Sequence, residues 1–106
     1  MHKELTFEQL MNKHTDFTLS TFTEANPLSS LNKLREEMDE VAHEINHGSY
    51  GESLMEEYVD CIMCLLDSAA RLGIGANMIR SAFEKKIEKN LSRTWVKNED
   101  NTYSHV

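Results

Sequence analysis

The sequence contains few of the residues that break helices: one proline and four glycines among 106 residues. It also lacks any sustained two-residue alternation of apolar and polar side chains with β-branched residues, which is typical of half-buried strands. Proline and glycine interrupt helices more strongly than any other residue, so their scarcity favours long helices. These two absences argue against a mainly β fold and predict helix through most of the chain.

Long apolar runs and paired cysteines are missing as well. No stretch approaches the roughly 18 apolar residues of a membrane-spanning helix, and the first residues lack the apolar segment of a signal peptide. The two cysteines, Cys61 and Cys64, lie within one predicted helix, so no disulfide framework is indicated. We therefore expect a cytoplasmic protein that has no membrane partner.

Positive charge is scarce: 11 lysines and arginines face 18 aspartates and glutamates, which gives a formal net charge of −7. Such a surface argues against nucleic acid or an anionic membrane as a partner. An acidic protein that binds phosphates has to rely on bound cations and a few placed basic residues. At this length the chain is most simply one domain, residues 1–106, with a modest core that partner subunits can complete.

Four helices are predicted between the punctuating proline and glycines. Asn26-Pro27 is a cap residue followed by a first-turn proline, which is typical of a helix start. Two segments are predicted to be irregular: the stretch that follows the first helix and runs through Phe22, and the polar tail from Thr94 onward. Short connections favour an antiparallel helical bundle, so the fold class is all-α. The predicted helices span about residues 7–14, 27–47, 52–72 and 76–92.

Apolar residues recur at helical spacing and predict the buried faces. The second helix has one such stripe, formed by Leu31, Leu34, Met38, Val41 and Ile45. The third helix has a second apolar surface in addition to its core face, formed by Val59, Met63, Leu66 and Ala70. The fourth helix is predicted to bury Ala76, Ile79, Phe83 and Ile87. Because a helix that is apolar on two sides is usually sandwiched, we expect a homodimer or homotetramer that completes the bundle.

Two acidic pairs are the strongest chemical signal in the sequence. Glu37 and Glu40 lie three residues apart in the second helix, and Glu57 and Asp60 lie three apart in the third. Residues three apart are neighbours on a helix surface, so each pair occupies one face. Four carboxylates brought together by two packed helices repel one another and favour a bound cation. Oxygen ligands suit Mg²⁺ or Mn²⁺, whereas the simpler alternative is a solvated acidic face.

A basic and amide stripe in the fourth helix gives groups suited to an anion. Lys86, Asn90 and Arg93 follow one another at spacings of four and three residues, beside the predicted apolar face. Charged hydrogen-bond donors of this kind bind phosphate oxygens. Phe22 is a candidate wall for a nucleobase, and Trp95 either stacks on a base or anchors the tail.

Two competing motifs predict other chemistry. His43-Glu44-Ile-Asn-His47 matches the HExxH helix of zinc proteases, which needs a third protein ligand and a substrate cleft. Cys61 and Cys64 form a CxxC pair, but reactive pairs lie at helix N-termini and these two are in mid-helix. Small core residues are therefore the simpler interpretation of the cysteines.

The acidic pattern resembles a known family. The segment Arg35-Glu36-Glu37-Met-Asp-Glu40, followed after sixteen residues by Glu57-Tyr-Val-Asp60, is similar to the EExxE…ExxD pattern of MazG-type, all-α nucleoside triphosphate pyrophosphatases. Residues 55–69, 86–95 and 104–106 resemble a phage and bacterial subgroup, the dATP/dGTP pyrophosphohydrolases. This resemblance extends from about residue 17 to the C-terminus.

The resemblance implies an enzyme that hydrolyses (deoxy)nucleoside triphosphates to a nucleoside monophosphate and pyrophosphate with Mg²⁺, for which Mn²⁺ can substitute. The implied metal ligands are Glu37, Glu40, Glu57 and Asp60. The implied phosphate or sugar ligands are Lys86, Asn90 and Arg93, and the candidates for catalytic roles are Glu36, as base or second-metal ligand, and Lys86. Two alternatives stay open: a non-catalytic regulator that binds nucleotide or metal, and an HExxH zinc hydrolase.

Overall fold

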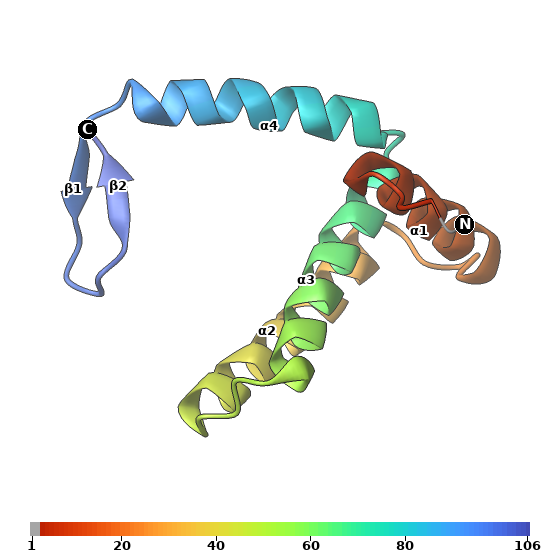
Figure 1. Cartoon of the computed structure of the whole chain (residues 1–106), viewed down its shortest axis with the longest axis horizontal. Coiled ribbons are helices and arrows are strands. Elements are labelled where there is room, and N and C mark those ends of the chain that lie inside the picture. Colours follow the sequence, from red (N-terminus) through yellow and green to blue (C-terminus); the bar gives the residue numbers. More distant parts are fainter. Residues whose placement is uncertain (1–2) are drawn as a thin grey trace. The chain divides into compact units, whose positions relative to one another are not determined.

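The computed structural model describes residues 3–106 and contains, within them, four helices and a two-stranded sheet (Figure 1). The helices are α1 (Phe7–Thr21), α2 (Pro27–Asn46), α3 (Glu52–Ala70) and α4 (Ala76–Leu91), and the strands are β1 (Trp95–Lys97) and β2 (Tyr103–His105). The predicted all-α class is confirmed. The chain divides into one compact unit that ends at Ala76 and a second that spans Asn77–Val106. In the described part of the chain, none of the helices is long and apolar enough to cross a membrane.

Helices α2 and α3 form the main packed pair of the first unit, and local sequence signals set their ends (Figure 1). The Asn26 side chain accepts hydrogen bonds from the backbone N–H groups of Leu28 and Ser29, with Pro27 in the first turn. Gly48 follows α2 at a φ of 70°, a left-handed conformation that glycine adopts without strain. The predicted bounds of this pair are therefore close to the observed ones.

Helix α1 is longer than predicted. Thr6 and Gln9 form a reciprocal capping box at its start, and the helix continues to Thr21, through residues predicted to be irregular. Met11 and Thr18, two turns apart on one face, are 7% and 2% exposed. The threonines in this stretch have modest helix propensity, but α1 packs against α3, and this tertiary contact stabilises its second half.

The C-terminal tail forms a hairpin, so the prediction of irregular structure was wrong. β1 and β2 pair antiparallel with Trp95 opposite His105. In the turn, Asn98 N–H donates to Thr102 O at 2.7 Å, and Asn101 adopts a φ of 69°, a conformation that asparagine tolerates better than most residues. Strands of three residues are too short to produce a recognisable alternation in the sequence.

Apolar burial is lower than the predicted stripes imply. On α2, Leu31, Leu34 and Val41 are half-buried, but Met38 is 50% exposed and Ile45 41%. On α4, Ala76 is buried and Ile79 half-buried as predicted. The same prediction was wrong for Phe83 and Ile87, because their side chains are 66% and 46% exposed in the single chain. Buried residues of the first unit include several polar ones, namely Thr18, Ser30, Asp67 and Ser68.

Candidate functional site

Three carboxylates converge between α2 and α3. Oxygen atoms of Glu37, Glu57 and Asp60 all lie within 4.8 Å of one another. Glu40 lies outside this group, although its charge contributes to the raised pKa of Glu57. Glu36 also lies outside it: its side chain is 71% exposed and pairs with Lys33 at 3.3 Å. The structure thus brings together three of the four metal ligands that the sequence suggested.

The carboxylate cluster is electrostatically strained when it is fully ionised. Partial burial raises the pKa of Glu57, and the hydrogen bond and negative charge of Glu37, then the charge of Asp60, raise it further. Lys33 offsets part of this negative charge, because its Nζ lies 3.4 Å from Glu37 Oε1. A divalent cation among the three carboxylates would relieve the remaining repulsion, and an all-oxygen donor set suits Mg²⁺ or Mn²⁺.

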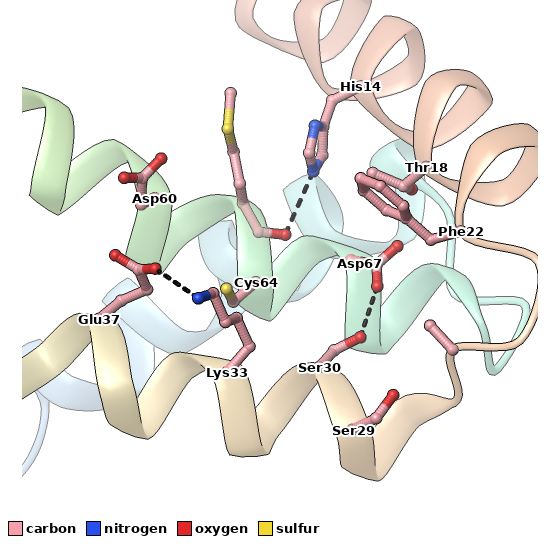
Figure 2. A pocket seen from close by; sticks show the side chains of 12 residues that line it. His14, Thr18, Phe22, Ser29, Ser30, Lys33, Glu37, Asp60, Cys64 and Asp67 are labelled. Atoms are coloured by element: carbon pink, nitrogen blue, oxygen red, sulfur yellow. Dashed lines mark hydrogen bonds and ion pairs between the residues drawn. The ribbon is translucent and has the colours of Figure 1, made fainter.

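The carboxylate cluster lies at one end of a pocket of about 340 Å³ in the first unit (Figure 2). Glu37 and Asp60 line that end, whereas Thr18, Phe22 and Asp67 line the other. The volume falls within the range of small-molecule sites. Phe22, suggested by the sequence as a nucleobase wall, therefore lines the same pocket as two of the predicted metal ligands. Other lining residues are His14, Ala25, Ser29, Ser30, Lys33, Met63 and Cys64.

A buried polar network forms the end of the pocket away from the carboxylate cluster. Ser30 Oγ donates to Asp67 Oδ2 at 2.5 Å, and Arg71 Nε donates to the same oxygen at 2.8 Å. Arg71 also donates to Ala25 O at 3.0 Å and to Thr18 O at 3.2 Å. Burial alone would raise the pKa of Asp67, but the hydrogen bonds from Arg71 and Ser30 outweigh it, so the pKa is lowered.

Sequence reasoning assigned no role to Asp67, Ser30 or Lys33. One signal could have found Asp67. Asp60, Cys64, Asp67 and Arg71 form a polar stripe at spacings of four, three and four residues along an otherwise apolar α3. An acidic residue in such surroundings has to find a partner or a ligand.

The remaining predicted ligands belong to the second unit and cluster at the end of α4. Arg93 Nη1 donates to Asn90 Oδ1 at 3.3 Å, and Trp95 Nε1 donates to Asn90 O at 3.0 Å. The Trp95 ring meets the His105 ring edge-on, with centroids 6.0 Å apart. Lys86 lies one turn earlier on α4 and is exposed. Trp95 thus anchors the hairpin to the end of α4, as one of its two predicted roles required.

The HExxH segment does not form a three-ligand site in residues 3–106, where the only such group is the carboxylate cluster. The exposed His43 and His47 rings stack with centroids 4.1 Å apart, and His47 Nδ1 lies 2.8 Å from His43 O. Glu44 accepts a hydrogen bond from Ser53 Oγ at 2.6 Å.

Cys61 and Cys64 are free, half-buried thiols. Burial raises the pKa of each thiol, and neighbouring carboxylates, Glu37 foremost, raise it further. Both therefore stay protonated near neutral pH and are weak nucleophiles. Cys64 also lines the pocket, so it is not only a core residue as predicted.

The structure is similar to one solved as the MazG-like pyrophosphohydrolase of cyanophage S-2L bound to dGDP and three catalytic Mn²⁺ ions per active site. The TM-score is 0.75, the identity is 20%, and the match covers 97% of this chain and 99% of the other. At this identity the likeness establishes the shared MazG-like fold.

The family follows from the sequence. The sequence model of the dATP/dGTP pyrophosphohydrolase family matches residues 10–106, so the chain belongs to that family and is a nucleotide pyrophosphohydrolase. No curated protein is significantly similar to it.

Proposed function

We propose that this enzyme hydrolyses deoxynucleoside triphosphates, dATP and dGTP foremost, to the nucleoside monophosphate and pyrophosphate, using Mg²⁺ or Mn²⁺. The observation that carries the proposal is the approach of the Glu37, Glu57 and Asp60 oxygens to within 4.8 Å at one end of a pocket. Family membership and the Mn²⁺ ions of the cyanophage structure support it.

The donors in the carboxylate cluster fit a hard divalent cation. Glu37, Glu57 and Asp60 would hold it, with Glu40 as a further proposed ligand whose charge already acts on Glu57. When bound, Mg²⁺ or Mn²⁺ supplies Lewis-acid chemistry that neutralises phosphate charge and makes a water molecule more acidic. The protein's part is to hold its oxygens in a fixed arrangement between two packed helices.

The pocket orients the substrate by its shape. With the phosphates at the carboxylate cluster, the base extends toward Phe22, whose aromatic ring gives a stacking surface. Lys33 lines the same pocket and offers a cation to the phosphates while it stays paired with Glu37. These contacts fix the α-phosphorus relative to the attacking water.

Residues outside the pocket lining complete the proposal. Lys86, Asn90 and Arg93 are proposed to bind phosphates or sugar, because they combine two cations and an amide within two turns of chain. Lys86 is also proposed to act in catalysis by stabilising charge on the leaving group. Glu36, which pairs with Lys33 beside Glu37, is proposed as base or second-metal ligand.

We also propose that residues 1–106 act as one domain and that the enzyme is a homodimer or homotetramer. The family match spans both compact units, which supports a single functional domain. Large apolar side chains such as Phe83 and Leu91 are 66% and 75% exposed in the single chain. Exposed apolar surface of this kind favours association.

Product analysis tests the proposed reaction. Each deoxy- and ribonucleoside triphosphate is incubated with the protein and Mg²⁺ or Mn²⁺, and the products are separated by anion exchange. We expect monophosphate and pyrophosphate, because the chain belongs to a pyrophosphohydrolase family. Diphosphate and orthophosphate as primary products would overturn the assignment. Nucleotide binding without turnover would indicate a non-catalytic regulator. Asp60→Asn protein, purified in parallel, is the control for contaminating phosphatases.

A further inference from the structure

One oxygen of the Asp67 carboxylate lacks a hydrogen-bond donor. Oδ2 accepts a hydrogen bond from Ser30 Oγ (Figure 2) and another from Arg71 Nε. Oδ1 is buried and has no hydrogen-bond partner. The residue is 7% exposed, and it lines the pocket. Buried polar atoms in folded proteins nearly always have a partner, so an orphaned oxygen in a pocket wall marks a place for a donor group.

The neighbouring side chains do not provide that donor. Thr18 is the nearest candidate: a hydrogen-bonding interaction with its hydroxyl helps to lower the pKa of Asp67. The hydroxyl nevertheless has its well-formed hydrogen bond with Thr15 O at 3.2 Å, and Asp67 Oδ1 is left without one. Arg71 directs its guanidinium to Asp67 Oδ2, Ala25 O and Thr18 O. An ionised carboxylate can only accept hydrogen bonds, so the missing partner is an N–H or O–H group.

The position of Asp67 along α3 indicates which part of a substrate it meets. Asp67 lies seven positions after Asp60, which is about 10.5 Å along a helix axis. A nucleotide whose phosphates lie at the carboxylate cluster directs its base, the part farthest from the phosphates, toward Asp67. Phe22 lines this same end of the pocket.

We propose that Asp67 Oδ1 accepts a hydrogen bond from the exocyclic amino group of a purine base and thereby determines base specificity. This inference rests on the proposed function. Adenine presents such an amino group at N6 and guanine at N2, whereas a carbonyl oxygen or bare ring nitrogen at that position would face the carboxylate oxygen without a proton between them. Discrimination follows because the unmatched base leaves a buried charged acceptor unsatisfied.

Asp67→Asn provides a sharp test because the surrounding donors fix the orientation of the new amide. Ser30 and Arg71 both donate at the Oδ2 position, so the amide oxygen has to occupy it. The amide nitrogen then replaces Oδ1 and turns the acceptor into a donor. The hydrogen bonds from Ser30 and Arg71 are kept and the charge of the ion pair is lost, while the group offered to the base is reversed.

The experiment compares substrates that differ by one amino group. One pair is dATP and the triphosphate of purine 2′-deoxyriboside, and the other is dGTP and dITP. We expect the wild-type enzyme to prefer the amino-bearing member of at least one pair by roughly ten- to a hundredfold in kcat/KM, the range for a hydrogen bond to a charged group. In Asp67→Asn that ratio should fall to about one or below.

Ser68→Ala is the matched control. Ser68 is buried beside Asp67, its hydroxyl donates to Pro27 O at 2.9 Å, and it does not line the pocket. The variant should lower the unfolding temperature and keep the wild-type ratio. Wild-type ratios near one in both pairs would overturn the inference, as would an unchanged ratio in Asp67→Asn or a collapsed ratio in Ser68→Ala. Failure to hydrolyse any nucleotide would instead refute the proposed function.

Discussion

Arg71 donates from Nε to Asp67 Oδ2 at 2.8 Å, across one helical turn at the C-terminal end of α3. The side chains are 7% and 11% exposed, so this is a buried ion pair. The remaining guanidinium nitrogens bind Thr18 O on α1 and Ala25 O before α2. One side chain therefore joins three segments around the end of the pocket.

Arg71→Met should destabilise the protein by about 3–5 kcal/mol, because it leaves the Asp67 charge buried without its cation. Urea unfolding with a spectroscopic probe measures the loss. Arg80→Met is the matched control, since Arg80 pairs with Glu84 at 3.2 Å and both side chains are more than two-thirds exposed. Its cost should stay below about 1 kcal/mol. Equal losses in the two variants would contradict the role assigned to the network.

The Asp67 carboxyl should make stability depend on acid pH. Its pKa lies below the ordinary 3.8, so the unfolded chain takes up this proton more readily than the folded protein. The stabilisation is therefore complete above pH 3.8 and is lost as the pH falls through the lower, folded-state pKa. Glu57 has the opposite effect: because its pKa is raised, its contribution to stability increases as the pH falls.

Urea unfolding at intervals from pH 5 downward measures this dependence. Asp67→Asn should flatten it below pH 4. Asp100 also has a lowered pKa, from its hydrogen bonds with Thr102 in the exposed hairpin turn. Asp100→Asn separates the contribution of Asp100 to the pH dependence from that of Asp67. If Asp100→Asn changed the pH dependence of stability and Asp67→Asn did not, Asp67 would not be its source.

The pair α2 and α3 could be predicted because its signals are local. Asn26-Pro27 and Gly48 mark helix ends through short-range geometry, and spacing of three residues places Glu57 and Asp60 on one face. Spacing does not fix how far one helix is shifted along the other. Spacing alone therefore could not show that Glu37, and not Glu40, lies within 4.8 Å of Glu57 and Asp60.

The features that sequence reasoning missed depend on contacts between distant residues. The second half of α1 is held by Arg71, which is 53 residues from Thr18. Asp67 becomes a pocket residue through Ser30, which is 37 residues away. No local pattern specifies such pairs, and only the fold brings them together.

His43→Ala should leave nucleotide hydrolysis largely unchanged. His43 is exposed, and within residues 3–106 it belongs to no group of three candidate metal ligands. Initial rates at saturating substrate and Mg²⁺ measure the effect, with circular dichroism as a check on folding. A large loss of activity in a folded variant would revive the zinc-hydrolase hypothesis.

Val59→Glu should weaken the proposed self-association. Val59 is 44% exposed and lines an apolar groove between α1 and α3, where a charge would be costly to bury. Light scattering at micromolar concentration should show a dimer or tetramer for the wild type and a smaller species for the variant. Met55→Glu, on the same helix but outside the groove, is the control. A monomeric wild type would refute the proposed assembly.

Asp60→Asn should abolish hydrolysis while leaving the metal-free fold equally or more stable, because it removes one charge from three mutually repelling carboxylates. Even groups that only support a metal ligand cost about 10–100-fold when mutated, so loss of a ligand should exceed that range. Turnover with excess Mg²⁺ measures the loss of hydrolysis, and thermal unfolding in chelator measures the stability. Mn²⁺ titration calorimetry measures a third expected effect, weaker metal binding. Asp39→Asn removes an exposed carboxylate from α2 and should leave all three unchanged. Wild-type turnover or undiminished Mn²⁺ binding in Asp60→Asn would show that the carboxylate cluster is not the metal site.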